Sequence, residues 1–267
     1  MTPTQLEGRF DRSLAVTGPV RLEIETDAGT VRVSTGEAGT VRVRGIVRAK
    51  NSLFGLGDPE SHIQEIEENP PIQQSGNKIR VSDHVKSGLF LGHPTVLLDI
   101  TVPLDTSVRA KADSGGIRIE GVQGSVQCET DSGFLEVVGT GSSVNAEADS
   151  GRIEIRQVTG PVRSEVDSGD ILALEIGGEI EAKSDSGEIQ LSQTVAARVR
   201  AQADSGRIQL KLAPGAGYRV RARADSGHIQ VPEMSRSRNS KNEVYGDILG
   251  GGPSVDVEVD SGDIDIT

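Results

Sequence analysis

The tripeptide Asp-Ser-Gly occurs eight times, and its spacing restricts the fold more than any other feature of the chain. Successive copies begin 18 residues apart four times and then 19, 21 and 35 residues apart. A nearly fixed period indicates a repeat architecture, in which one small unit stacks on the next. The first residues of the eight copies are Asp113, Asp131, Asp149, Asp167, Asp185, Asp204, Asp225 and Asp260.

Each repeat contains two segments with a period of two. In one repeat Ile153 and Ile155 flank a glutamate, and the next segment runs Val162-x-Ser164-x-Val166. Such alternation predicts short strands with one buried face. The inward side chains shrink from Val or Ile to Ala or Ser toward the next Asp-Ser-Gly, so we expect a narrow interior. Eighteen residues cannot bury their own apolar face, whereas stacked rows share it. We therefore predict an all-β, single-stranded, parallel β-solenoid, right-handed, with about 18 residues per coil.

The regularity of the repeat divides the chain into three parts of one continuous domain. Residues 1–105 contain degenerate coils, visible at 19–45, and an insertion at 46–95 with a short helix that starts near Asp58 and ends before Pro70. We expect this insertion to be a lid or a contact surface. Residues 106–231 are the regular solenoid.

Residues 232–267 form the third part, a polar loop followed by a hairpin around 250–253 or by a loosened coil. A chain that ends in a strand exposes a bare edge. We expect residues 232–259 to cover that edge, or self-association there, or a longer natural chain.

Composition and charge limit the partners. The formal net charge of −12 opposes binding to nucleic acid or to anionic lipid. No apolar stretch is long enough to cross a bilayer, and residues 1–20 lack the pattern of a secretory signal, so we expect a soluble chain in an unassigned compartment. The low aromatic content, 2%, disfavours the platforms of a carbohydrate-active enzyme.

The Asp-Ser-Gly tripeptide has two interpretations. As a turn, Gly supplies a positive φ and Asp accepts a local backbone hydrogen bond. As a cation site, stacked coils would place carboxylates in a file that calcium could neutralise. The simple turn needs no metal, and we expect none; the alternative cation file consists of Asp113, Asp131, Asp149, Asp167, Asp185 and Asp204.

No other residues form a recognisable catalytic or cofactor site. The four histidines, His62, His84, His93 and His228, lack metal-binding spacing. Cys128 occupies an inward column and is expected to be a small core residue. One outward column has mixed charges and is interpreted as a solvated face, or alternatively as a ligand stripe. That column contains Lys111, Glu129, Glu147, Glu165, Lys183, Gln202 and Arg223.

Three further segments add to the Asp-Ser-Gly rows: "GRFDRSLAVTGPV", "EENPPIQQSGNKIRVS" and "GGGPSVDVEVDSGDIDI". Together they resemble the bacterial putative-adhesin β-strand-repeat family, a domain of unknown function. The resemblance implies a β-solenoid associated with the cell envelope and without a known activity. We therefore expect a non-enzymatic structural or interaction module with a protein or glycan partner. The alternatives are a calcium-stabilised solenoid and, less favoured, a carbohydrate-active enzyme.

Overall fold

The computed structural model describes residues 5–50, 59–82 and 95–267, which belong to two compact units, Met1–Ser132 and Gly133–Thr267. Nearly all of the described secondary structure is β-strand, and strand β8 (Val126–Val138) continues from the first unit into the second. No helix among the described residues is long and apolar enough to span a bilayer.

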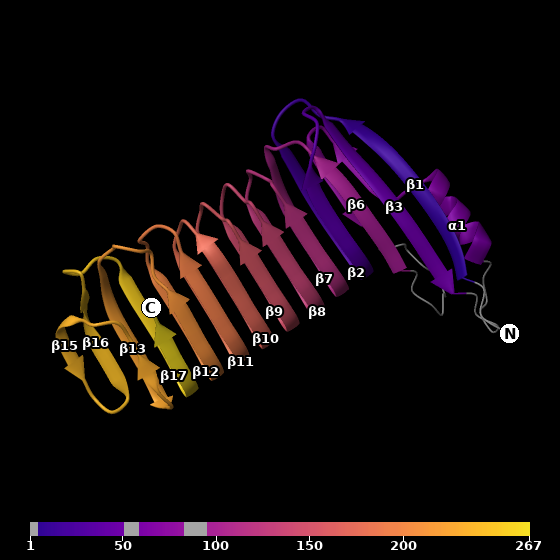
Figure 1. Cartoon of the computed structure of the whole chain (residues 1–267). Coiled ribbons are helices and arrows are strands. Elements are labelled where there is room, and N and C mark those ends of the chain that lie inside the picture. The colour runs from indigo at the N-terminus through magenta and orange to yellow at the C-terminus, as the bar shows by residue number, and fades with distance from the viewer. Residues whose placement is uncertain (1–4, 51–58, 83–94) are drawn as a thin grey trace. The chain divides into compact units, whose positions relative to one another are not determined.

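The second unit is a stack of long parallel strands (Figure 1). Val144 pairs with Val162, Val162 with Ile180, and Ile180 with Val199, so register partners are 18 or 19 residues apart. The predicted all-β, solenoid-like fold is confirmed. The regular strands are β9 (Val144–Arg156), β10 (Val162–Ile176), β11 (Ile180–Gln193), β12 (Val199–Lys211) and β13 (Tyr218–Ser226), followed by the short β14 (Ile229–Gln230).

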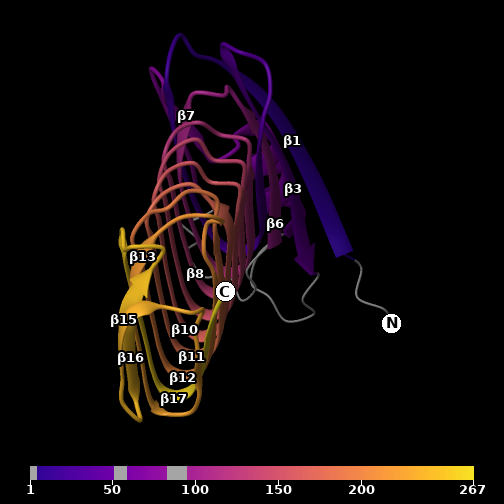
Figure 2. The ribbon, with the colours of Figure 1, turned by 60° about the vertical axis from the view of Figure 1, so that its left-hand side comes forward.

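Each long strand of this unit has two arms, one before and one after Asp-Ser-Gly. In β9 the buried positions are Val144, Ala146 and Ala148 in the first arm, and Ile153 and Ile155 in the second. The buried positions change from even to odd numbers across the tripeptide, which turns both apolar faces inward. Figure 2 shows the resulting flattened coils, with two sides joined by bends at one end and by loops at the other. In the first arm of β9, the two buried positions nearest the bend are both alanines.

Glycine is required at the bend by conformation and by space. Gly169 has φ +145°, a region that side-chain-bearing residues rarely adopt. A Cβ built on Gly169 would overlap the carbonyl oxygen of Gly151 in the preceding coil. The same relation links Gly187 to Gly169 and Gly206 to Gly187. Because the backbones of successive coils stack so closely, the third residue of the tripeptide has to be glycine.

The last Asp-Ser-Gly row does not lie at the end of this stack. β17 (Ser254–Ile266) pairs in parallel with β12 on one side and with β13 and β14 on the other. The amide of Thr267 donates to the carbonyl oxygen of Leu210, and the amide of Leu212 donates to that of Thr267. The prediction of a bare edge at the last strand is therefore wrong, because β17 is inserted between two earlier rows.

The segment between these rows forms an antiparallel hairpin. β15 (Ser235–Asn239) pairs with β16 (Glu243–Ile248), and β16 pairs with β13. The predicted polar loop "SRSRNSKN" (235–242) is thus partly a strand, and the hairpin turns at 240–242 rather than around 250–253. β15 follows β16 at the margin of this unit, where the exposed Arg238 and the shortness of the strand are typical of a protected edge.

The first unit combines parallel and antiparallel pairing. β2 pairs in parallel with β7, and Gly29, within the row predicted at 19–45, is the register partner of Gly115. The other side of β2 is shared by β5 and β6, also parallel. β3 is antiparallel to both β1 and β6, so these strands are not the coils that we predicted. The strands are β1 (Gln5–Ala15), β2 (Val20–Thr35), β3 (Thr40–Lys50), β4 (Ile72–Ser75), β5 (Lys78–Ser82), β6 (Thr95–Val102) and β7 (Thr106–Glu120).

The predicted helix is present as α1 (Pro59–Glu68), and it packs against β1 (Figure 1). The amide of Arg9 in β1 donates to Oε1 of Glu67 at 2.7 Å. Arg12 donates to the carbonyl oxygens of Glu67 and Glu68, which lie at the carboxyl end of the helix. The helix therefore covers β1. The capping residue Asp58, and His84 and His93 of the predicted lid, lie outside the described residues.

Candidate interaction surface

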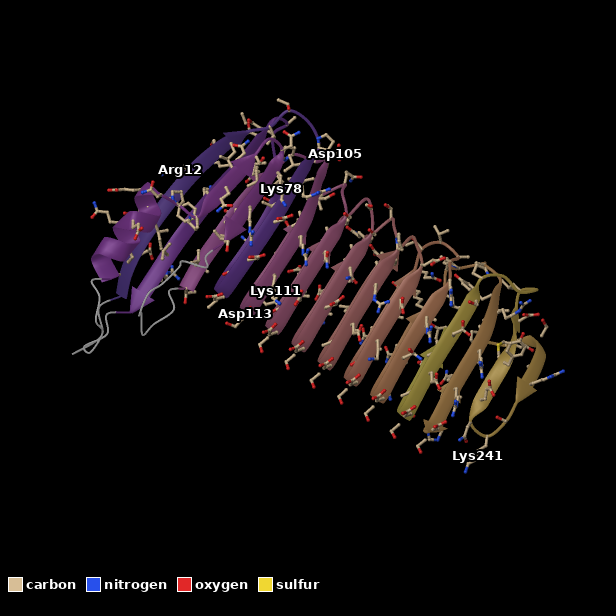
Figure 3. All side chains as sticks on the ribbon, turned by 180° about the vertical axis from the view of Figure 1, so that it is seen from behind. Arg12, Lys78, Asp105, Lys111, Asp113 and Lys241 are labelled. Atoms are coloured by element: carbon tan, nitrogen blue, oxygen red, sulfur yellow. The ribbon has the colours of Figure 1, made fainter. Side chains whose placement is uncertain are left out.

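The Asp-Ser-Gly bends form a file in the second unit. Ser168 is the register partner of both Ser150 and Ser186, and Ser205 pairs with Ser261. In the first unit Ser114 pairs with Ala28, and Figure 3 shows Asp113 at the margin of the strands, with Lys111 on the adjoining strand face. Of the predicted cation file, Asp113, Asp131, Asp149, Asp167 and Asp204 are exposed, and Asp185 is half-exposed.

No metal centre is assembled from these side chains. Within residues 5–50, 59–82 and 95–267, no three His, Cys, Asp or Glu side chains converge as a metal site requires. The tripeptide lies at a backbone bend stacked coil on coil, as the turn interpretation predicts. Calcium binding along the file stays an untested alternative.

The position directly after the tripeptide has a role that sequence reasoning missed. Oδ1 of Asp170 accepts the amide of Glu188 in the next coil at 3.0 Å, and Oδ1 of Asp263 accepts the amide of His228 at 3.0 Å. The pKa of Asp263 is lowered from its ordinary value, mainly by the hydrogen bond from the His228 amide and to a lesser degree by the Arg207 guanidinium. These carboxylates bond amides beside the bend, where strand pairing is interrupted.

The mixed-charge column lies on the outward side of the first arms. Glu147, Glu165, Lys183 and Gln202 follow one another in register. Lys183 Nζ lies 3.3 Å from Glu165 Oε1, and this hydrogen bond raises the pKa of Lys183. In the first unit Lys111 Nζ lies 2.6 Å from Glu129 Oε1, which likewise raises the pKa of Lys111. The ion pairs agree with a solvated face.

The insertion of β17 changes this surface in a way that the repeat did not reveal. Glu258 stands between Gln202 and Arg223, and its Oε1 lies 3.3 Å from the Arg223 guanidinium. In the adjacent outward column the charges alternate along neighbouring strands. That column contains Asn145, Arg163, Glu181, Arg200, Asp256 and Arg221.

Two shallow hollows lie over these columns. One measures about 350 Å³ and is lined by β12, β13 and β17; the other measures about 390 Å³ and extends over β9, β10 and β11. Arg198 and Arg200 line both hollows. Exposed charged side chains beside a shallow hollow are suited to binding and orienting a polar ligand.

Of the remaining candidates, the structure describes the side chains of Cys128 and His228. Cys128 is 1% exposed, and burial raises the pKa of its thiol to about 12, so it is the core residue that we predicted. His228 is exposed, with Nδ1 3.5 Å from Oδ1 of Asp263. The side chains of His62, His84 and His93 lie outside the described part of the chain.

One polar cluster is internal. The hydroxyl of the buried Tyr218 donates to Oε1 of Gln193 and accepts the amide of Ala213, both at 3.1 Å. Gln193 in turn donates to the carbonyl oxygens of Gly178 and Ala197. The cluster satisfies backbone groups at the loop end of the coils, where Tyr218 fills the core.

The stacked, in-register rows define an all-β repeat protein of the solenoid-like class. The chain belongs to the Toastrack DUF4097 family, whose profile matches residues 20–267. No curated protein is similar enough in sequence to match the chain.

Solved structures of adhesin-like proteins resemble this chain. A protein from Bacteroides fragilis, described as a putative adhesin, is 13% identical, with 97% of each chain covered and a TM-score of 0.50. A protein from Clostridium sporogenes, described as a putative cell adhesion protein, is 12% identical over 97% of this chain and 98% of that chain, with a TM-score of 0.28. The Bacteroides structure shows a likeness of fold.

Proposed function

We propose that this chain is a non-enzymatic interaction module of the bacterial cell surface. In this proposal it is a right-handed parallel β-solenoid of about 18 residues per coil, whose outward charged columns bind a protein or glycan partner. The main support is the register of β9–β12, which places exposed side chains of successive coils side by side. Right-handed crossovers between parallel strands are the general rule.

Three further observations support a binding role over a catalytic one. The chain belongs to a family of unknown function, and the Bacteroides fragilis protein of similar fold is described as a putative adhesin. Carbohydrate-active enzymes need a cleft with paired carboxylates and usually aromatic platforms. This chain has two Tyr, four Phe and no Trp, and the two hollows on its first-arm face are shallow.

A glycan array and a set of purified surface proteins, probed with matched variants, test the proposal. The first variant, E147Q/E165Q/K183Q, changes three exposed or half-exposed first-arm side chains that follow one another in register. The control, E154Q/E188Q/R207Q, makes the same kind of change on the second arms. Each changes only outward side chains, so we expect melting within about 2 °C of the wild type, as for surface substitutions in general.

We expect a ligand that binds the wild type to lose at least about tenfold in affinity with the first-arm variant only, because contacts to charged side chains dominate polar recognition. Equal binding of that ligand by all three proteins would count against the first-arm face. Failure of the wild type to bind any probe would count against the interaction role itself.

A further inference from the structure

Arg198 and Arg200 are placed together by the start of β12. Arg198 directly precedes the strand and Arg200 is its second residue, so a period of two directs both side chains to the outward side. Both are exposed, and both line the two hollows on the first-arm face. Strand pairing places Arg200 between Glu181 of β11 and Asp256 of β17.

The other arginines around these hollows are already paired. Arg163 donates to Oε2 of Glu181 at 3.0 Å. Arg221 donates to Oε1 of Glu243 at 2.7 Å, and Arg223 lies 3.3 Å from Glu258. Arg198 and Arg200, by contrast, have no ion-pair partner among the residues that the structure describes. Two guanidinium groups, each with five N–H donors, are therefore free to bind a ligand.

The local charge is opposite to that of the whole chain. Four arginines line the 350 Å³ hollow together with Asp256 and Glu258, which gives a formal charge of +2. The chain as a whole has a formal charge of −12. A small positive area on an acidic protein attracts a short anion, whereas the surrounding field repels a long polyanion. The planar fork of Arg matches the two oxygens of a carboxylate.

We propose that Arg198 and Arg200 bind the carboxylates of a short acidic oligosaccharide, such as a chain of uronic acids. This inference rests on the proposed interaction role and names its ligand class. Each hollow has room for a sugar ring, and the two adjoin at the arginine pair. Asp256 and Glu179 at the hollows accept hydrogen bonds from ring hydroxyls, which separates a sugar acid from a simple anion.

The test is calorimetric titration with trigalacturonate, and with neutral maltotriose as the ligand of equal length. The variant is R198Q/R200Q. The control, R152Q/R207Q, removes the same charge from exposed arginines of the second arms. We expect trigalacturonate to bind the wild type and the control within about twofold of each other, and to bind R198Q/R200Q at least about tenfold more weakly. Raising salt from about 50 to 300 mM should weaken binding, and maltotriose should not bind.

Two results would overturn the inference: no binding of trigalacturonate by the wild type at about 10 mM, or the same loss of affinity in both arginine variants. Neither result touches the proposed function. If a glycan or protein on the arrays still binds R198Q/R200Q but is lost with E147Q/E165Q/K183Q, the interaction role stands and only the acidic sugar is wrong.

Discussion

Replacing Gly169 with alanine should destabilise the solenoid far more than a typical change at an exposed bend. The backbone there has φ +145°, which costs a residue with a Cβ about 1–3 kcal/mol. The new methyl would also overlap the carbonyl oxygen of Gly151, so the two coils must separate locally. Overpacking of this kind costs about 1–3 kcal/mol. The two effects together give a loss of about 4 kcal/mol in the free energy of unfolding.

Two control variants separate the two causes. Gly215 also has a positive φ, +73°, but nothing lies within 4 Å of a Cβ built there, so Gly215→Ala should cost only about 1–2 kcal/mol. Gly160 has no positive φ, but its Cβ would overlap the carbonyl oxygen of Ser142, so Gly160→Ala should show the steric cost alone.

The assay is chemical unfolding followed by circular dichroism, together with thermal melting. A loss of about 4 kcal/mol corresponds to a fall in Tm of about 8–16 °C for a protein of this size. We expect the cost at Gly169 to approach the sum of the costs at Gly160 and Gly215. A Gly169→Ala protein within about 1 kcal/mol of the wild type would refute the claim that backbone stacking fixes this glycine.

The buried Ser164 Oγ has no hydrogen-bond partner among the described residues, and Ser164 lies between two alanines of its column. Ser164→Ala should therefore raise the free energy of unfolding, measured in urea, by about 1 kcal/mol. A decrease would show that the hydroxyl is bonded to water. Tyr218→Phe should cost about 1–3 kcal/mol, because Gln193 and the Ala213 amide lose their partner; a melting temperature equal to that of the wild type would contradict this. The pKa of the Cys128 thiol is about 12 in the folded chain and 9.0 in its ordinary state, so the unfolded chain loses this proton at lower pH than the folded chain. The free energy of unfolding should therefore fall between about pH 9 and 12. Cys128→Ala should lack that part of the fall, and identical pH profiles of the two proteins would contradict burial of the thiol. Millimolar calcium should leave Tm unchanged, since Asp-Ser-Gly as a simple turn needs no metal, whereas a rising midpoint would show that the folded chain binds the ion.

The parallel stack could be predicted from the sequence because every row repeats both its bend and its alternation. The position of β17 between β12 and β13 could not be predicted from the 35 residues that separate Asp225 from Asp260. The same separation would be found if β17 were stacked beyond β13. One signal was present: the inward residues Val255, Val257 and Val259 do not shrink toward Asp260, unlike most earlier rows. A row whose inward side chains keep their size toward the bend must pack differently from the rows beside it.

Strand direction in the first unit was also beyond the pattern. Alternation predicts strands within 19–45 but does not say whether they run parallel or antiparallel to their neighbours. The arginine pair was missed for a related reason. Arg198 and Arg200 read as ordinary surface residues until β17 places Asp256, and β13 beyond it, beside β12. The site thus depends on long-range pairing that no local segment specifies.

The position of β17 also sets the order in which the molecule can be completed during synthesis. Earlier rows can add one after another as the ribosome releases them, but β13 emerges before the strand that must lie between it and β12. Pairing Val199 with Val255 closes 56 residues instead of 18 or 19, which costs about 1 kcal/mol more in chain entropy. The pairing of β12 and β13 with their shared neighbour therefore cannot be completed until β17, which follows β13 in the chain, has been translated.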